Sequence, residues 1–195
     1  MGKRVRRHVS WVLGFGLLAG AAAGSARGEQ PSVESIGGPR SVCELPVTFA
    51  VPKPWKKDPS QEAVVDVERS RYAPCYLVLG TGKTKVDLYV YVYDKRHGDD
   101  PREVLHEFVG YGMSNYGEYE RDSHESLLTL ARHRAAEMDY EGTPPDHYAS
   151  FRTRLLSVTG SDATIVLGVG ADNPGADERT RRIYDQVKST IRFAS

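Results

Sequence analysis

Apolar and polar residues alternate strictly along the stretch Lys85–Asp94, KVDLYVYVYD. Aliphatic residues occupy one side of this pattern and tyrosines the other: Val86, Leu88, Val90 and Val92 against Tyr89, Tyr91 and Tyr93. A period of two is typical of a β-strand, because successive side chains point to opposite faces of the sheet. The pattern predicts a central strand, which forms a hairpin with the strand Cys75–Leu79 through the turn Gly80–Lys83.

Two stretches have helical spacing instead. Asp99–Pro101 offers a capping aspartate and a proline at the first helical position, and apolar residues then recur every three to four positions as far as Met113. This helix should end near Tyr116–Gly117. A second helix is predicted from Ala176 or Asp177 to Ser189, with acidic residues near its positive N-terminal end.

The remaining periodic segments predict further strands, separated by a turn at Arg69–Pro74 and a loop at Glu141–Pro145. Hairpins interrupted by two helices indicate an α+β fold, with a mostly antiparallel sheet covered by one helix on each face or by both on one face. These strands are expected at Leu45–Val51, Ala63–Glu68, Tyr119–Arg121, Leu127–Arg132, Ala135–Tyr140, His147–Thr159, Ala163–Ala171 and Ile191–Phe193.

The N-terminus has the three parts of a secretory signal: the basic GKRVRR, an apolar run at Val9–Ala23 and small residues through Ala26. We expect cleavage between Ala23 and Gly28, by the general or the twin-arginine route, since Arg6 and Arg7 leave both open. An uncleaved membrane anchor is the alternative, although the run is short for a span of about 20 apolar residues. No cysteine lies directly after this run, at the end of the signal, so we expect no lipoprotein anchor there.

The organisation that follows is a signal peptide at 1–28, a flexible tether at 29–41, rich in Pro, Gly and Ser, and one domain at 42–195. Five of the 26 basic residues and none of the 26 acidic residues lie in the first 28 positions, so the mature chain carries a net charge near −5. This balance argues against nucleic acid as a partner, because its binding depends on basic patches.

The chain has two cysteines, Cys43 and Cys75. An even number in an exported chain predicts a disulfide, which would contribute roughly 3–4 kcal/mol by restricting the unfolded chain. Two unpaired buried thiols are the alternative. Their spacing excludes a CxxC redox motif, and two soft ligands without a nearby histidine disfavour zinc.

Four segments partly match catalytic or cofactor-binding motifs, but each lacks a residue that its motif requires. The GKT at Gly82–Thr84 lacks the upstream glycine and the following helix of a phosphate loop, and the glycines of Gly168–Gly170 lack the rest of a dinucleotide fingerprint. His106 has Gly110 four positions on, so HExxH is absent, and Tyr116 replaces the second glycine of GxSxG. We therefore predict no cofactor and no metal site.

Two features keep functional interpretations open. The tyrosine face, Tyr89, Tyr91 and Tyr93, either lies under a helix or forms a partner surface, since tyrosine offers rigid apolar area with a polar tip. Five histidines follow the signal, and some of them could converge with acids into a catalytic or zinc site. They are His97, His106, His124, His133 and His147.

The chain resembles the PsbP-like superfamily, which includes Mog-type Ran-binding proteins and many exported actinobacterial proteins and lipoproteins. The resemblance rests on Phe49–Pro52 followed by Trp55, on the Asp-Pro helix Asp100–Asn115, on Ala135–Tyr140 and on the closing segment Ile183–Phe193. It covers Cys43–Phe193 and implies an α/β/α sandwich. Its characterised members act mostly as binding or accessory proteins, but no residue set for their partners is found in this sequence.

These observations predict an exported, non-enzymatic binding or accessory protein of the cell envelope, with an unknown protein or small-molecule partner and no stable membrane span after signal cleavage. We expect it to be secreted or to stay in the wall space. The alternative is a secreted hydrolase or metal-dependent enzyme whose site gathers scattered histidines and acids.

Overall fold

The computed structural model describes residues 32–59, 71–94, 100–114, 120–143, 151–171 and 173–193. The chain divides into two units, Met1–Gln30 and Pro31–Ser195, and the described residues belong to the second. Several sequence predictions lie outside the described residues: the signal at 1–28, the strand Ala63–Glu68, and the histidines His97 and His147.

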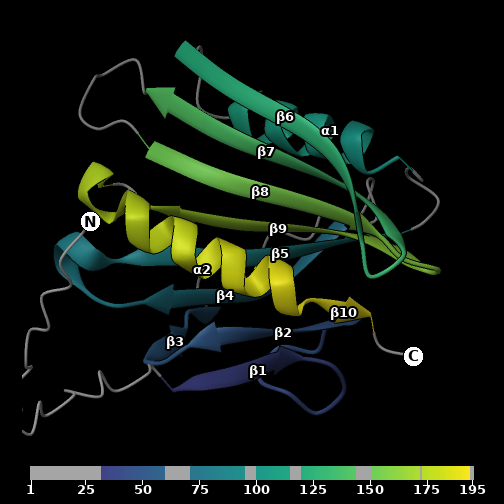
Figure 1. Cartoon of the computed structure of the whole chain (residues 1–195), viewed down its shortest axis with the longest axis horizontal. Helices are drawn as coiled ribbons and strands as arrows, with labels where there is room; N and C mark the ends of the chain where they lie inside the picture. Colours follow the sequence, from purple (N-terminus) through teal and green to yellow (C-terminus); the bar gives the residue numbers. More distant parts are fainter. Residues whose placement is uncertain are drawn as a thin grey trace, which may run out of the picture. The chain divides into compact units, whose positions relative to one another are not determined.

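Seven strands form the larger sheet in the order β3-β4-β5-β9-β8-β7-β6, and every neighbouring pair is antiparallel (Figure 1). The predicted hairpin of β4 and β5 is confirmed, and β5 lies inside the sheet between β4 and β9. The bounds are β3 Trp55–Lys57, β4 Arg71–Leu79, β5 Val86–Asp94, β6 Glu120–Leu130, β7 His133–Thr143, β8 Phe151–Thr159 and β9 Ala163–Ala171.

A smaller antiparallel sheet has the order β1-β2-β10, with β1 Val33–Gly37, β2 Val47–Pro52 and β10 Arg192–Phe193. Strand β1 lies inside the predicted tether 29–41, so that prediction is wrong for these residues. Their strand contributes a single buried side chain, Ile36, opposite Phe49. One buried residue in five produces no visible alternation, which is why the sequence pattern missed this strand.

The two helices agree with their predicted positions: α1 is Pro101–Ser114 and α2 is Asp177–Thr190. The Asp100 carboxylate caps α1 by accepting a hydrogen bond from the Arg102 backbone N–H at 2.9 Å. The helices cover opposite faces of the larger sheet, α2 in front of it and α1 behind it in Figure 1. The fold is therefore α+β, with a helix on each face.

The alternation in β5 separates two cores. Its aliphatic residues pack with α2 and with the smaller sheet, through Phe49 and Val187 among others. Its opposite face packs with α1, where Tyr93 and Leu105 are buried. Each such side chain contributes about 1.5–3 kcal/mol when fully buried, so one strand anchors both helices.

The predicted disulfide is present. Cys43 and Cys75 are bonded to each other and both are fully buried. The bond joins the segment that precedes β2 to strand β4, so it connects the smaller sheet covalently to the larger one.

Three local predictions need correction. The two separate strands predicted around Arg121 and Leu127 belong to one strand, β6, whose polar middle section hid its continuity, and the second ends at Leu130 rather than Arg132. Strand β7 continues to Thr143, into the predicted loop. Strand β4 begins at Arg71, inside the predicted turn, and its register with β5 shifts between Tyr72 and Cys75. Pairing with neighbouring strands extends these segments beyond their own apolar pattern.

Candidate functional site

A pocket of about 330 Å³ opens on the α2 side of the larger sheet. Helix α2 packs on β2, β8 and β9, which leaves the same face of β6 and β7 beside it. The lining comes from these strands and from one side of the helix. It consists of His124, Ser126, Glu137, Met138, Asp139, Arg154, Arg181, Tyr184, Asp185 and Lys188.

Strand register explains why polar side chains converge here. In the register of β6 and β7, Glu137 lies opposite Ser126 and Asp139 lies opposite His124. Asp139 also lies opposite Arg154 of β8. Residues directly opposite one another share a face of the sheet, so these side chains form one polar stripe across three strands.

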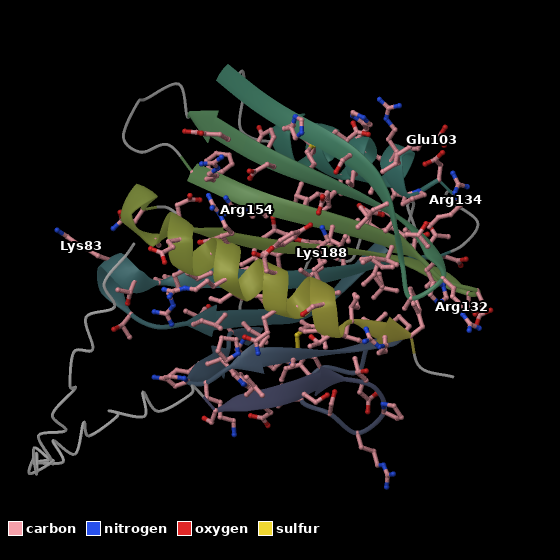
Figure 2. All side chains as sticks on the ribbon, in the orientation of Figure 1. Lys83, Glu103, Arg132, Arg134, Arg154 and Lys188 are labelled. Carbon is pink, nitrogen blue, oxygen red and sulfur yellow. A yellow bond between two sulfur atoms is a disulfide. The ribbon has the colours of Figure 1, made fainter. Side chains whose placement is uncertain are left out.

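The helix supplies the other wall of the pocket. Its lining residues Arg181, Tyr184, Asp185 and Lys188 are separated by one, three or four positions, so they lie on one side of α2. Figure 2 shows Arg154 and Lys188 along the side of α2 that is nearest β8. The pocket is thus bounded by a rigid sheet and a rigid helix.

Glu137 is held by three donors, one from β6 and two from α2. Its Oε1 accepts a hydrogen bond from Ser126 Oγ at 2.9 Å, and its Oε2 accepts one from Tyr184 Oη at 3.0 Å and another from Lys188 Nζ. Burial acts to raise the pKa of Glu137, but the hydrogen bonds from Lys188, Ser126 and Tyr184 outweigh it and leave this pKa lowered. Glu137 is therefore ionised and linked to both walls of the pocket.

The adjoining cluster contains two arginines and two aspartates. Arg154, whose side chain is 9% exposed, donates from Nη1 to Asp177 Oδ1 at 3.0 Å, and its Nε lies 3.7 Å from Asp139 Oδ1. Arg152 donates from Nη2 to Asp139 Oδ2 at 3.2 Å. The nearby carboxylates of Asp139 and Asp177 outweigh burial and raise the pKa of Arg152. The four charges neutralise one another and fix the floor of the pocket.

The arrangement favours binding over proton transfer. A carboxylate with a lowered pKa is a weak base at neutral pH, and the Ser126 hydroxyl is already used as a hydrogen-bond donor to this carboxylate. Burial, followed by the charge of Glu137, raises the pKa of Tyr184, so this hydroxyl stays protonated. The groups that line the pocket are thus suited to hydrogen bonding with a ligand.

The predicted tyrosine face lies on the α1 side of β5. Tyr93 is 1% exposed, so it offers no area to a partner in this conformation. Tyr89 and Tyr91 are half-buried beside Phe108 of α1, with ring centroids 6.0 and 5.0 Å from its ring. Burial raises the pKa of Tyr89, which hydrogen-bonds to Thr153. Their role as a partner surface stays a prediction.

The described histidines do not converge. His106 lies on α1, where its Nε2 is 2.9 Å from Glu125 Oε2. His124 lines the pocket on the opposite side of the sheet. The His133 ring packs against the Phe193 ring, with 4.4 Å between the two ring centroids. Among the described residues, no group of three or more His, Cys, Asp or Glu side chains is arranged to hold a metal ion.

The glycines at the end of β9 have a packing role. Gly168 lies opposite Tyr89, and a Cβ atom at this position would come within 2.2 Å of the Tyr89 ring. The absence of a side chain lets the ring lie flat across β9. The sequence analysis considered these glycines only as a dinucleotide fingerprint and missed this contact.

The sequence analysis missed every charged residue of the pocket except His124. A usable signal was present in β7, where Glu137, Asp139 and Glu141 occupy alternate positions of a strand whose other face is apolar. Acidic residues at alternate positions of a strand whose other face is buried predict polar or basic side chains opposite them. The identity of those side chains depends on α2, which lies about 40 residues further along the chain.

Two solved structures are similar to parts of this chain. The structure of LpqN from Mycobacterium tuberculosis, described as involved in cell envelope biogenesis, is similar over 84% of this chain and 91% of that chain, with a TM-score of 0.49 and 14% identity. PA94 from Pseudomonas aeruginosa, a protein of unknown function, is similar over 76% of this chain and 92% of that chain, with a TM-score of 0.46 and 10% identity.

No curated protein matches the chain. In the described part of the chain, no helix is long and apolar enough to cross a membrane. A family model described as uncharacterised lipoprotein matches residues 18–191, which includes nearly all of the described fold. The chain therefore belongs to a family of uncharacterised lipoproteins.

Proposed function

We propose that this protein is an exported, non-enzymatic accessory protein of the cell envelope, which binds a small polar ligand in the pocket between α2 and β6–β8. Membership of a lipoprotein family and the secretory pattern of residues 1–28 support an extracytoplasmic location. The buried disulfide also fits an oxidising compartment.

The observation that carries the binding role is the network of hydrogen bonds and ion pairs that holds the polar side chains of the pocket. Glu137 is bound from β6 and α2 at once, and Asp139 is bound by two arginines of β8. Polar groups that are already fixed lose little conformational entropy when a ligand binds. A volume of about 330 Å³ is at the lower end of the range of small-molecule sites.

The experiment is a native mass spectrum of the exported protein, purified from its own envelope fraction under non-denaturing conditions. We expect an adduct of small mass, and we expect a Ser126→Trp variant, which fills the pocket, to lose it. A matched Thr48→Trp variant on the smaller sheet should keep the adduct. An adduct retained by Ser126→Trp, or no adduct on the wild type, would contradict the proposal, and release of an altered ligand would favour the hydrolase alternative.

The location is tested separately. We infer that the mature chain begins between Ala23 and Gly28 and is secreted or stays in the wall space. N-terminal sequencing of the protein from fractionated cells should find this start in the extracytoplasmic fraction. An intact Met1 in the membrane fraction would instead indicate the uncleaved anchor.

We also propose that the fold is a PsbP-like sandwich and that the tyrosine face forms a second contact surface. A helix on each face of an antiparallel sheet supports a PsbP-like sandwich. The partly exposed rings of Tyr89 and Tyr91, together with the Tyr76 ring, whose centroid is 6.3 Å from that of Tyr89, support a second contact surface on the α1 side.

A further inference from the structure

We infer that the pocket takes an uncharged, polyhydroxylated ligand, a neutral saccharide. This inference rests on the proposed function of the pocket as a ligand site and names the chemical class of that ligand. Three features of the pocket support it: the balance of its charges, the pairing of most of these charges with an opposite charge, and the unused hydrogen-bonding capacity of the same groups.

The charges of the lining balance. Three acidic residues, Glu137, Asp139 and Asp185, face three basic residues, Arg154, Arg181 and Lys188. The adjoining hollow of about 70 Å³ shares His124 and Asp139 with the pocket and adds one acid and one base, Glu141 and Arg152. A ligand of either net charge therefore gains little from the summed field of the site.

A cationic group is disfavoured at Asp139. Asp139 Oδ1 is buried, so the exposed part of this carboxylate is on the side of Oδ2. Arg152 donates to Oδ2 at 3.2 Å, and Arg154 lies 3.7 Å from Oδ1. An ammonium group that approached Asp139 would meet two guanidinium groups at short range, and this repulsion offsets the attraction of the carboxylate.

An anionic group is disfavoured at the accessible bases. Lys188 already donates to Glu137, and Arg181, whose side chain is 61% exposed, lies 3.9 Å from Asp177. Asp185 follows Arg181 by four positions on the same side of α2. A ligand carboxylate would have to displace one of these acids or lie against it.

Hydroxyl groups can add to the existing pairs without breaking them. A carboxylate oxygen can accept more than one hydrogen bond, and a guanidinium group carries five donors. Asp139 Oδ2 can accept a hydrogen bond from one ligand hydroxyl, while Arg181 and Lys188 can donate hydrogen bonds to the oxygens of other hydroxyls. A saccharide presents such donors and acceptors side by side and carries no charge that a neighbouring residue would repel.

The test is a nuclear magnetic resonance titration of the isotopically labelled exported protein with single sugars. Glucose, galactose and mannose are the neutral probes, and glucosamine and glucuronate are charged versions of the same ring. We expect at least one neutral hexose to shift the backbone amides around Glu137, Asp139 and Lys188. The matching charged sugars should bind about fivefold more weakly or worse.

Two variants and a control locate the contact. Asp139→Asn should weaken binding about tenfold, because a hydrogen bond to a charged group becomes one to a neutral amide. Asp185→Asn, on the exposed side of α2, tests the same pocket if Asp139→Asn fails to fold, and it should also weaken binding. Asp162→Asn, in the turn between β8 and β9, should bind as the wild type does.

The outcomes separate this inference from the proposed function. Tighter binding of glucosamine or glucuronate than of any neutral hexose would overturn the inference. The inference would also be overturned if no hexose bound to a protein that carries another small molecule in its native mass spectrum. In that case the proposed function would still stand. Maltotetraose distinguishes the source: binding at least as tight as that of glucose indicates a glycan end, and weaker binding indicates a free sugar.

Discussion

Glu137 joins α2 to the larger sheet, and its removal should be costly for stability. In a Glu137→Ala variant, Tyr184 keeps only the Leu155 carbonyl at 3.4 Å, and Lys188 and Ser126 lose their acceptor. A hydrogen bond to a charged group contributes about 1.5–3 kcal/mol. Tyr184 is 5% exposed and loses nearly this full amount, whereas the partly exposed Lys188 and Ser126 can hydrogen-bond to water instead.

We therefore expect Glu137→Ala to lower the free energy of unfolding by about 3 kcal/mol, and Glu137→Gln, which keeps neutral hydrogen bonds, by about 1 kcal/mol. For a chain of this size, 3 kcal/mol corresponds to a decrease in Tm of about 6–12 °C. The assay is thermal and urea unfolding followed by circular dichroism. Glu178→Ala is the matched control, because this carboxylate is 82% exposed and its pair with Arg182 at 3.7 Å is worth about 0.5 kcal/mol at most.

The same group gives a pH dependence of known sign. The pKa of Glu137 is lower in the folded protein than in the unfolded chain, so its stabilisation is complete above the unfolded pKa and is lost as the pH falls through the folded pKa. The difference in stability between the wild type and Glu137→Gln should shrink below about pH 4.5. A loss for Glu137→Ala no larger than for Glu178→Ala, or a difference that grows in acid, would refute this reasoning.

Three further changes probe the rest of the fold. Gly168→Ala should lower stability by about 1–3 kcal/mol in urea unfolding because its Cβ would meet the Tyr89 ring at 2.2 Å, and a neutral result would contradict that packing. Replacing both Cys43 and Cys75 by Ala should cost about 3–4 kcal/mol, and a mass of the unreduced, alkylated wild type that shows two free thiols would disprove the bond. Replacing Tyr89 and Tyr91 by Ser, with the fold intact, should abolish any pull-down partner of the α1 side, and unchanged partners would remove that surface.

The elements that the sequence predicted well carry their own periodic pattern. Strand β5 alternates because both of its faces are covered, and α2 repeats because only one of its sides is buried. The disulfide between Cys43 and Cys75 could be predicted from the number of cysteines and the predicted compartment alone. In each case the physical cause is local to the segment, so the pattern is visible without the rest of the chain.

The elements that it missed owe their structure to distant partners. Strand β1 buries only Ile36 and is ordered by its pairing with β2. The pocket depends on Tyr184 and Lys188, which meet Glu137 from 47 and 51 positions away. Sequence spacing alone specifies neither contact, because each follows from where α2 lies on the sheet.

The position of the ligand tests the central claim most directly. The small molecule released from the exported protein should be added back to isotopically labelled protein while the backbone amides are followed by nuclear magnetic resonance. We predict shifts concentrated at Ser126, Glu137, Asp139, Arg154 and Lys188, around the pocket beside α2. Shifts confined to Tyr76, Tyr89 and Tyr91 on the other face of the sheet, or no shifts at all, would contradict it.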